Sequence, residues 1–250
     1  MKRLVALVIG LVIGYGMFAN AVAEKVYLTS LDWPPYTGKK LTQQGASVAV
    51  AKAVFKAAGY DLIVEFFPWK RAVDLAKDDP KYAGYFPEYF AAELEQDFIF
   101  SEPMGSGPLG FAELKSAAVA WQTLHDLKEV KIGTVSGYVN TAEFDQMAAK
   151  GELRVDAAGS DTTNLLKLNG GRISLAVIDK NVMHYLLSTE KKLVKAKNNI
   201  QFNNKMLEDK KLYICFKKND KGKMLVNAFN KALTEVDVQK IMNKYFSDEM

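Results

Sequence analysis

The stretch "VKIGTVSGYVNTAEFDQMAA", residues 130–149, decides the fold class of this 250-residue chain. Its first six residues, "VKIGTV", are apolar and β-branched at alternate positions and predict a short strand. After "SGY", Asn140 or Thr141 supplies the N-cap of a helix over "VNTAEFDQMAA". A strand followed directly by a helix is the unit from which α/β folds are built.

Strand-like and helix-like segments alternate in the same way along the rest of the chain. Before the opening stretch, the pattern predicts strands over residues 25–31, 61–68 and 82–86, and helices over residues 46–58 and 69–77. After it, the pattern predicts strands over residues 152–158, 173–179 and 211–216, and helices over residues 162–171, 181–189 and 224–246. The expected fold class is therefore α/β.

These segments form two α/β cycles of similar size, separated by the glycine-rich "PMGSGPLG" at residues 103–110. Two cycles predict two lobes, with the chain crossing between them near residues 109–114 and again near residues 211–216. We expect residues 24–110 and 213–250 to form lobe 1 and residues 111–212 to form lobe 2. Two lobes joined by a two-strand hinge leave a cleft between them, where small ligands bind.

The first 23 residues have the pattern of a secretory signal peptide. Lys2 and Arg3 form a basic start, an apolar stretch follows to Phe18, and "AVA" at residues 21–23 is a cleavage signal. The apolar stretch is about 15 residues long, shorter than the ~20 that a spanning helix needs, although an uncleaved anchor is the alternative. No cysteine follows the cleavage signal, so we expect a periplasmic protein without a lipid anchor.

Charge and cysteine content exclude several classes of protein. The formal net charge of +4 falls to +2 once Lys2 and Arg3 are removed, and the remaining lysines are scattered, which argues against a nucleic-acid partner. Cys215 is the sole cysteine, which leaves no disulfide within the chain, and its apolar neighbours predict a buried thiol. The sequence contains no metal-binding cluster and no cofactor motif, so we expect no cofactor.

Five further motifs occur in a fixed order behind the signal peptide: "WPPYT" at residues 33–37, "FSEPM" at 100–104, "KIGTVSGY" at 131–138, "GGRISLAVID" at 170–179 and "NKALTEVDVQKIMNKYF" at 230–246. With these motifs the chain resembles the periplasmic solute-binding proteins of polar amino-acid ABC transporters, the extracellular solute-binding protein family 3. The resemblance covers essentially all of the sequence after the signal peptide. It implies a type II periplasmic-binding fold whose two lobes close over a ligand.

The resemblance also implies roles for particular residues. The aromatic residue of the early loop, here Trp33, stacks on the ligand. The carboxylate that ends the apolar strand of the second lobe, here Asp179, accepts the ligand's ammonium group, an assignment that charge-assisted hydrogen bonding supports. The alternative for Asp179 is that it caps the helix beginning near Asn181. Asn140 and Thr141 stand at a helix N-terminus that favours an anionic ligand group, and their alternative is likewise a capping role.

One departure from the family pattern changes the expected ligand. Family members carry an arginine about six residues before "FS", which clamps the α-carboxylate of an amino acid, whereas Leu94 stands at or near that position here. No basic residue lies between Lys81 and Lys115. The remaining candidates in lobe 1 are five aromatic residues and one acid: Trp33, Tyr36, Trp69, Tyr85, Tyr89 and Glu88.

Together with Asp179, this set is typical of a site for a cation, because ring faces and carboxylates both attract positive charge. The alternative is that most of these aromatic residues belong to the core of lobe 1. Arg71 is a candidate for a different anion contact, or a solvated helix residue.

The favoured function is a monomeric, non-enzymatic binding protein that captures an amino acid or amine and delivers it to an ABC permease. A periplasmic dehydratase or lyase on the same scaffold is the alternative, with Glu88 or Asp179 as general acid. A third possibility is a subunit that reports its ligand to a membrane receptor, because the same lobe closure serves both purposes.

Overall fold

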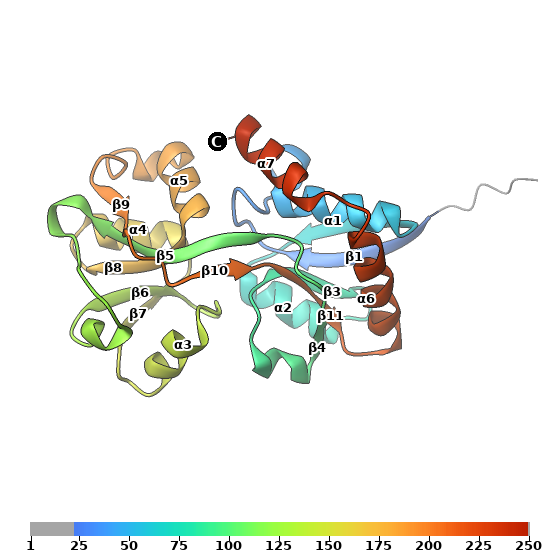
Figure 1. The fold of residues 1–250 in the computed structure, drawn as a ribbon, viewed down its shortest axis with the longest axis horizontal. Helices are drawn as coiled ribbons and strands as arrows, with labels where there is room; N and C mark the ends of the chain where they lie inside the picture. Colours follow the sequence, from blue (N-terminus) through green and yellow to red (C-terminus); the bar gives the residue numbers. More distant parts are fainter. Residues whose placement is uncertain (1–22, 250) are drawn as a thin grey trace, which may run out of the picture.

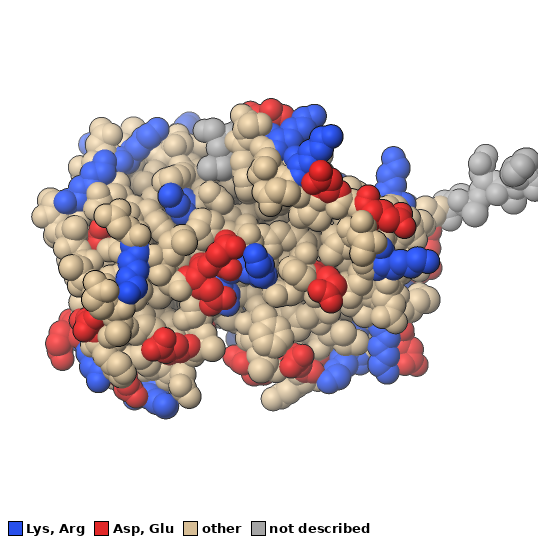
Figure 2. All heavy atoms as spheres, in the orientation of Figure 1, with Lys and Arg blue, Asp and Glu red and all other residues tan. Residues whose placement is uncertain are grey.

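The computed structural model describes residues 23–249. The predicted signal peptide lies almost wholly outside the described residues. None of the helices in the described part is long and apolar enough to span a membrane. Figure 2 shows basic and acidic side chains interspersed over one face of the molecule, with no stripe of a single sign.

Lobe 1 is built on a five-stranded sheet of order β2-β1-β3-β11-β4. The strands are β1 (Glu24–Ser30), β2 (Tyr60–Phe66), β3 (Gly84–Glu88), β4 (Phe98–Phe100) and β11 (Tyr213–Lys217). β1 runs parallel to β2 and β3, whereas β11 runs antiparallel to β3 and β4. The helices of this lobe are α1 (Ala46–Ala57), α2 (Trp69–Asp78), α6 (Asp220–Leu233) and α7 (Val238–Glu249).

Lobe 2 has a second sheet, of order β10-β5-β8-β6-β7, with β9 also paired to β5. The strands are β5 (Ser106–Leu114), β6 (Lys131–Val135), β7 (Arg154–Ala158), β8 (Leu175–Asp179), β9 (Ile200–Phe202) and β10 (Glu208–Lys211). The helices are α3 (Ala142–Ala149), α4 (Asp161–Asn169) and α5 (Lys180–Thr189). Short 3₁₀ helices lie at Thr42–Gln44, Ala92–Gln96, Lys115–Ala117, Leu124–Leu127 and Lys191–Leu193.

The chain passes between the two sheets along two adjacent segments (Figure 1). β5 and β10 pair with each other at the lobe junction, and the chain passes from β10 through Leu212 into β11 of lobe 1. β5 pairs within the sheet of lobe 2 from Ser106 onward, so this crossing precedes the expected boundary at 110/111 by a few residues. The glycine-rich segment is a strand because its backbone pairs on both sides, with β8 and β10.

Each lobe buries an apolar core between its sheet and helices. In lobe 1, the rings of Phe55, Phe216 and Phe229 lie within 5.2 to 6.2 Å of one another, measured between centroids. Cys215 is a free thiol with no exposed surface, which confirms the predicted burial. In lobe 2, Phe111 of β5 packs against Phe144 of α3, and this contact joins the sheet to the helix.

The C-terminal segment forms two helices rather than the single helix predicted over residues 224–246. α6 ends at Leu233 and α7 begins at Val238. Between them, Asp237 Oδ1 accepts a hydrogen bond from the backbone N–H of Lys240 at 2.9 Å. An aspartate in this position competes with the helical backbone and favours a new helix start. The second helix can therefore turn and pack against α1.

Candidate functional site

The aromatic loop after β1 forms a tight, hydrogen-bonded turn at the lobe interface. The backbone N–H of Trp33 donates to the carbonyl of Thr37 at 2.8 Å, and the Thr37 N–H donates back to the Trp33 carbonyl at 3.0 Å. The Trp33 and Tyr36 rings stack with centroids 4.6 Å apart and an interplanar angle of 22°. The turn thereby holds the Trp33 ring in place, with only 8% of the residue exposed.

Three hydrogen bonds join the lobes directly, so the cleft is closed in this structure. The Tyr36 hydroxyl donates to Asp179 Oδ2 at 3.1 Å and accepts from Asn181 Nδ2 at 2.8 Å. Trp69 Nε1, at the start of α2, donates to the carbonyl of Gly137 in lobe 2 at 3.0 Å. The Trp69 ring also meets the Tyr138 ring edge to face, with centroids 6.0 Å apart.

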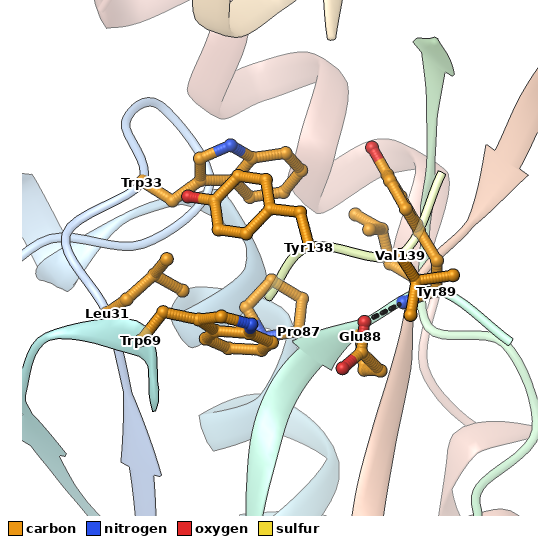
Figure 3. Close-up of a pocket in the computed structure, with 9 residues that line it drawn as sticks. Leu31, Trp33, Trp69, Pro87, Glu88, Tyr89, Tyr138 and Val139 are labelled. Carbon is orange, nitrogen blue, oxygen red and sulfur yellow. Dashed lines mark hydrogen bonds between the residues drawn. The ribbon is translucent and has the colours of Figure 1, made fainter. Parts of the chain in front are cut away.

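A small cavity of about 30 Å³ lies between the lobes, and Figure 3 shows its walls. The walls come from the carboxyl ends of β1 and β3, the start of α2, the loop between β6 and α3, and the crossing segment. The lining residues are Leu31, Trp33, Trp69, Pro87, Glu88, Tyr89, Tyr138, Val139 and Leu212. Carboxyl ends of strands are where open α/β sheets bind ligands. A volume of this size holds a water molecule or two, so a larger ligand requires the lobes to separate.

Glu88 is the one charged side chain among these nine lining residues. Its Oε1 accepts from the Tyr89 backbone N–H at 2.8 Å, and its Oε2 accepts from the Tyr85 hydroxyl at 3.1 Å. Burial raises the pKa of Glu88 to about 8, against the opposing effects of these two hydrogen bonds and of the Lys210 charge. The site therefore holds a carboxyl group whose ionised form has no counter-ion in the cavity.

Two more buried carboxyl groups stand on the lobe 2 side. Burial and the charge of Asp179 raise the pKa of Asp161, the first residue of α4, to about 7. The Trp33 side chain, across the interface, acts in the opposite direction and lowers the pKa of Asp161. Burial also raises the pKa of Asp179 to about 7. This effect outweighs the hydrogen bonds from Val182, Asn181 and Tyr36, which lower the pKa. All three carboxyl groups are more than nine-tenths buried.

A larger cavity of about 520 Å³ adjoins the small one. The two share the walls formed by Leu31, Trp33, Trp69 and Tyr138. Polar groups become frequent here, since the lining includes Asp32, Lys70, Ser136, Ser160, Asp161 and Thr162. The interlobe space thus has a narrow aromatic end and a wider polar end.

The structure brings six of the ten predicted site residues together. Four of them line the small cavity: Trp33, Trp69, Glu88 and Tyr89. Tyr36 and Tyr85 lie directly behind it, with their hydroxyl groups bonded to Asp179 and Glu88. These aromatic residues therefore lie close together, and Tyr36 and Tyr85 are wholly buried.

The other four lie outside both interlobe cavities. Asp179 Oδ1 accepts from the backbone N–H groups of Asn181 and Val182 and caps α5, which was the alternative role for this residue. Thr141 caps α3, and Asn140 bonds to Asp145. Arg71 lies over the Phe67 ring, 5.5 Å from its centroid. A ligand role for these four stays a prediction, and in this closed form their polar atoms serve the fold.

Sequence reasoning missed Tyr138 and Asp161. Tyr138 lies two residues before Asn140. It belongs to the motif "KIGTVSGY", but it was not named as a candidate site residue. Asp161 is the first residue of α4, separated from the end of β7 at Ala158 by Gly159 and the N-cap Ser160, whereas Asp179 ends β8 and is itself the N-cap of α5. Treating every loop that follows a strand of lobe 2 as a candidate would have found both residues.

Comparison with protein-family models and with curated proteins gives no match. Solved structures do match over most of the chain. An ancestral arginine-binding protein bound to arginine is 16% identical, with a TM-score of 0.72 over 90% of this chain and 98% of that one. An amino acid ABC transporter substrate-binding protein from Streptococcus pneumoniae bound to L-arginine is 16% identical, with a TM-score of 0.71 over 90% and 95%.

A third match is a histidine kinase sensor domain with similarity to periplasmic binding proteins. It is 13% identical, with a TM-score of 0.74 over 91% of this chain and 97% of that one. At these identities the likeness concerns the fold. The chain therefore has the two-lobed periplasmic-binding-protein fold that the sequence motifs predicted.

Proposed function

We propose that this protein is a solute-binding protein whose lobes close over a small ligand that carries an amine or another cationic group. The observation that carries this proposal is the set of three buried carboxyl groups at the lobe interface, Glu88, Asp161 and Asp179. Among residues 23–249, no lysine or arginine lines the small cavity beside Glu88. An ionised carboxylate in such a place is stabilised by a cation brought by the ligand.

The same site is poorly suited to the α-carboxylate of an amino acid. A bidentate arginine is the usual partner for that group. Leu94, at the position where the resemblance places the arginine, belongs to the 3₁₀ helix Ala92–Gln96 and lines neither interlobe cavity. Lys70 lines only the wider cavity, where an anionic part of a ligand would find it.

The fold supports capture by closure. The interlobe contacts of Trp33, Tyr36 and Trp69 come from lobe 1 and meet partners in lobe 2, so they form only when the lobes approach. A ligand that binds the closed form better than the open form shifts the population toward closure. An exported, monomeric protein that hands its ligand to an ABC permease is the role proposed here, and two structural neighbours of that class support it.

The histidine kinase sensor domain among the neighbours favours a second candidate, in which the closed form reports the ligand to a membrane receptor. A permease and ATPase encoded beside this gene would favour transport, and a receptor kinase would favour sensing. Neighbours described as substrate-binding proteins support a non-enzymatic role. Turnover of a bound compound, followed by mass spectrometry, would instead support the dehydratase or lyase alternative.

Native mass spectrometry of the purified protein tests the ligand class, because a co-purified compound is identified by its mass. A thermal-shift panel of amines and of basic, neutral and acidic amino acids extends the test. Ligand at ~100 times its dissociation constant adds about 2.7 kcal/mol of stability, a readily measured shift. We expect shifts with cationic compounds, and a panel in which acidic amino acids alone stabilise the protein would refute the proposal.

A further inference from the structure

The small cavity is walled by aromatic rings from both lobes. Trp33, Trp69 and Tyr89 come from lobe 1, and Tyr138 comes from the loop after β6 in lobe 2. Figure 3 shows Trp33 and Tyr138 on one side of the space and Trp69 on the other, with Tyr89 and Glu88 at its end. Eight of the nine lining side chains are apolar or aromatic, and the ninth is Glu88.

Negative charge acts on this space from two directions. The pKa of the Tyr138 hydroxyl is raised by burial and then by the charges of Asp161 and Glu88, which places its ring near both carboxyl groups. Lys210 lies over the Tyr89 ring, with its Nζ 5.3 Å from the ring centroid and 3.6 Å from Glu208 Oε1. Lys210 lines neither interlobe cavity, so the cavity itself has no resident cation.

Hydrogen-bond acceptors that converge on one point are scarce there. A primary ammonium group has three N–H donors and needs acceptors for them. Each oxygen of Glu88 already accepts one hydrogen bond, which leaves one lone pair on each for the three N–H donors of an ammonium group. The indole N–H groups of Trp33 and Trp69 are donors rather than acceptors, and that of Trp69 is used by the Gly137 carbonyl.

Tyr138 and Tyr89 carry the remaining polar groups on the wall, and the Tyr89 hydroxyl has no hydrogen-bond partner among the described residues. In Figure 3 it points away from the Glu88 carboxylate, so the two do not meet at a single nitrogen. A primary ammonium placed here would leave N–H groups unpaired in an apolar site, which is costly.

A fully alkylated ammonium has the opposite requirements. It has no N–H group to satisfy, its methyl groups pack against carbon walls, and its charge is attracted by ring faces and by nearby carboxylates. We propose that the cavity formed by Trp33, Trp69, Tyr89, Tyr138 and Glu88 binds the quaternary ammonium head of a small ligand. This inference rests on the proposed function and narrows its ligand class from amines in general to quaternary ammonium compounds.

Closure completes this site. Tyr138 is the ring contributed by lobe 2, so the cage has its fourth ring only when the lobes are together. The head displaces the direct contact between Trp69 and Tyr138, whose centroids are now 6.0 Å apart, and takes its place between the rings. The rest of the ligand extends past the shared walls into the wider polar cavity.

Three compounds test the inference: choline, its primary-amine counterpart ethanolamine, which lacks the three methyl groups, and 3,3-dimethylbutan-1-ol, the neutral carbon isostere of choline. Calorimetry and thermal shift on the purified protein, at matched ionic strength, measure the affinity for each. We expect choline to bind at least about ten-fold more tightly than either of the others. Comparable or tighter binding of ethanolamine overturns the inference and leaves the proposed capture of amines intact.

Comparable binding of dimethylbutanol overturns both, because the site would then not recognise charge. If none of the three binds, the cage inference is wrong, and a shift with any amine or amino acid of the broader panel would still preserve capture by closure. The outcomes therefore distinguish failure of the quaternary-ammonium site from failure of the proposed capture of cationic ligands.

Two variants locate the effect. Tyr138→Leu keeps an apolar wall and removes the lobe 2 ring, and we expect it to weaken choline binding by about ten-fold. Phe90→Leu is the matched control, since Phe90 is 46% exposed in lobe 1 and lines neither interlobe cavity. Glu88→Gln should weaken choline binding but not dimethylbutanol binding. Unchanged choline affinity in folded Tyr138→Leu would overturn the cage, whether or not Glu88→Gln folds.

Discussion

The Tyr36 hydroxyl in lobe 1 lies 3.1 Å from Asp179 Oδ2 in lobe 2, and the two residues are 143 positions apart in the chain. Asn181 Nδ2 donates to the same hydroxyl at 2.8 Å. The Phe246 ring of α7 packs edge to face on Tyr36, with centroids 5.7 Å apart, and fixes the ring from behind. A single tyrosine hydroxyl thus links the loop after β1 in lobe 1 to the start of α5 in lobe 2.

Tyr36→Phe tests this latch. The variant removes the donor to Asp179 and the acceptor for Asn181, and a buried polar group that loses its partner costs about 1–3 kcal/mol. We expect the free energy of unfolding to fall by that amount and the ligand-free protein to open, which small-angle X-ray scattering measures as a larger radius of gyration. Tyr60→Phe, at the far edge of the lobe 1 sheet, is the control. Unchanged scattering and stability would show that the hydroxyl does not hold the lobes together.

Gly107 of β5 makes the latch possible. A Cβ atom at this position would overlap both Asp179 Oδ2 and the Tyr36 hydroxyl. Gly107→Ala should therefore push the two groups apart, enlarge the ligand-free molecule in solution and weaken ligand binding. In Gly159→Ala the added Cβ meets no atom within 4 Å and the backbone is not left-handed, so scattering should not change. A Gly107→Ala protein with the compact scattering of the parent would contradict this role.

Much of the fold is predictable from local patterns. α1 spans Ala46–Ala57, and Gly59 follows with φ of 85°, a left-handed conformation that suits glycine and ends the helix. β8 was predicted from its continuous apolar run, which its full burial explains. In contrast, β10 reads "EDKK" and carries no hydrophobic signal, because its pairing with β5 comes from the tertiary structure.

The candidate site divides in the same way. Trp33 and Glu88 were found because a large ring beside a proline turn, or an acid at a strand end, is unusual in local sequence. Tyr138 and Asp161 were missed because their importance depends on the approach of the other lobe, which no local pattern encodes. The capping roles of Thr141 and Asp179 depend on local sequence and are therefore predictable. Their position outside both interlobe cavities depends on the tertiary structure and is not.

Trp33→Leu tests the stacking residue while it keeps apolar volume. Loss of a desolvated cation–ring contact should weaken binding of a cationic ligand by about 1 kcal/mol or more. Trp121→Leu is a matched control, because Trp121 is 8% exposed like Trp33 but packs on Phe111 inside lobe 2. Both variants should lose stability, measured by urea unfolding, and calorimetry should show a loss of affinity in Trp33→Leu alone. Equal affinities in the two variants would show that Trp33 has a structural role and does not contact the ligand.

Ionisation of the buried carboxyl groups should make the ligand-free protein less stable as the pH rises. The folded-state pKa is about 8 for Glu88 and about 7 for Asp161 and Asp179, all raised mainly by burial, whereas these groups titrate near pH 4 when the chain is unfolded. Between these limits the folded protein binds more protons than the unfolded chain. The stability that these groups contribute is therefore fully present below about pH 4, and it falls as the pH rises from there to about pH 8.

Other charges near these groups modify the size of the effect. Lys210 opposes the pKa rise of Glu88 while Glu93 adds to it, and Asp209 adds to that of Asp179. His184 works in the opposite sense, because burial lowers its pKa. Urea unfolding in His184→Gln across this range isolates the carboxyl contribution, and Glu88→Gln should flatten the upper part of the curve.

A bound cation should reverse the trend, because it pairs with the ionised carboxylates. Affinity should then rise over the same range of pH, and binding should release protons, which calorimetry in buffers of different ionisation enthalpy counts. Glu88→Gln should release fewer protons than the parent. Stability that rises from pH 5 to about pH 8 in the His184→Gln background, or proton uptake on binding, would contradict the assignment of these carboxyl groups to a cation site.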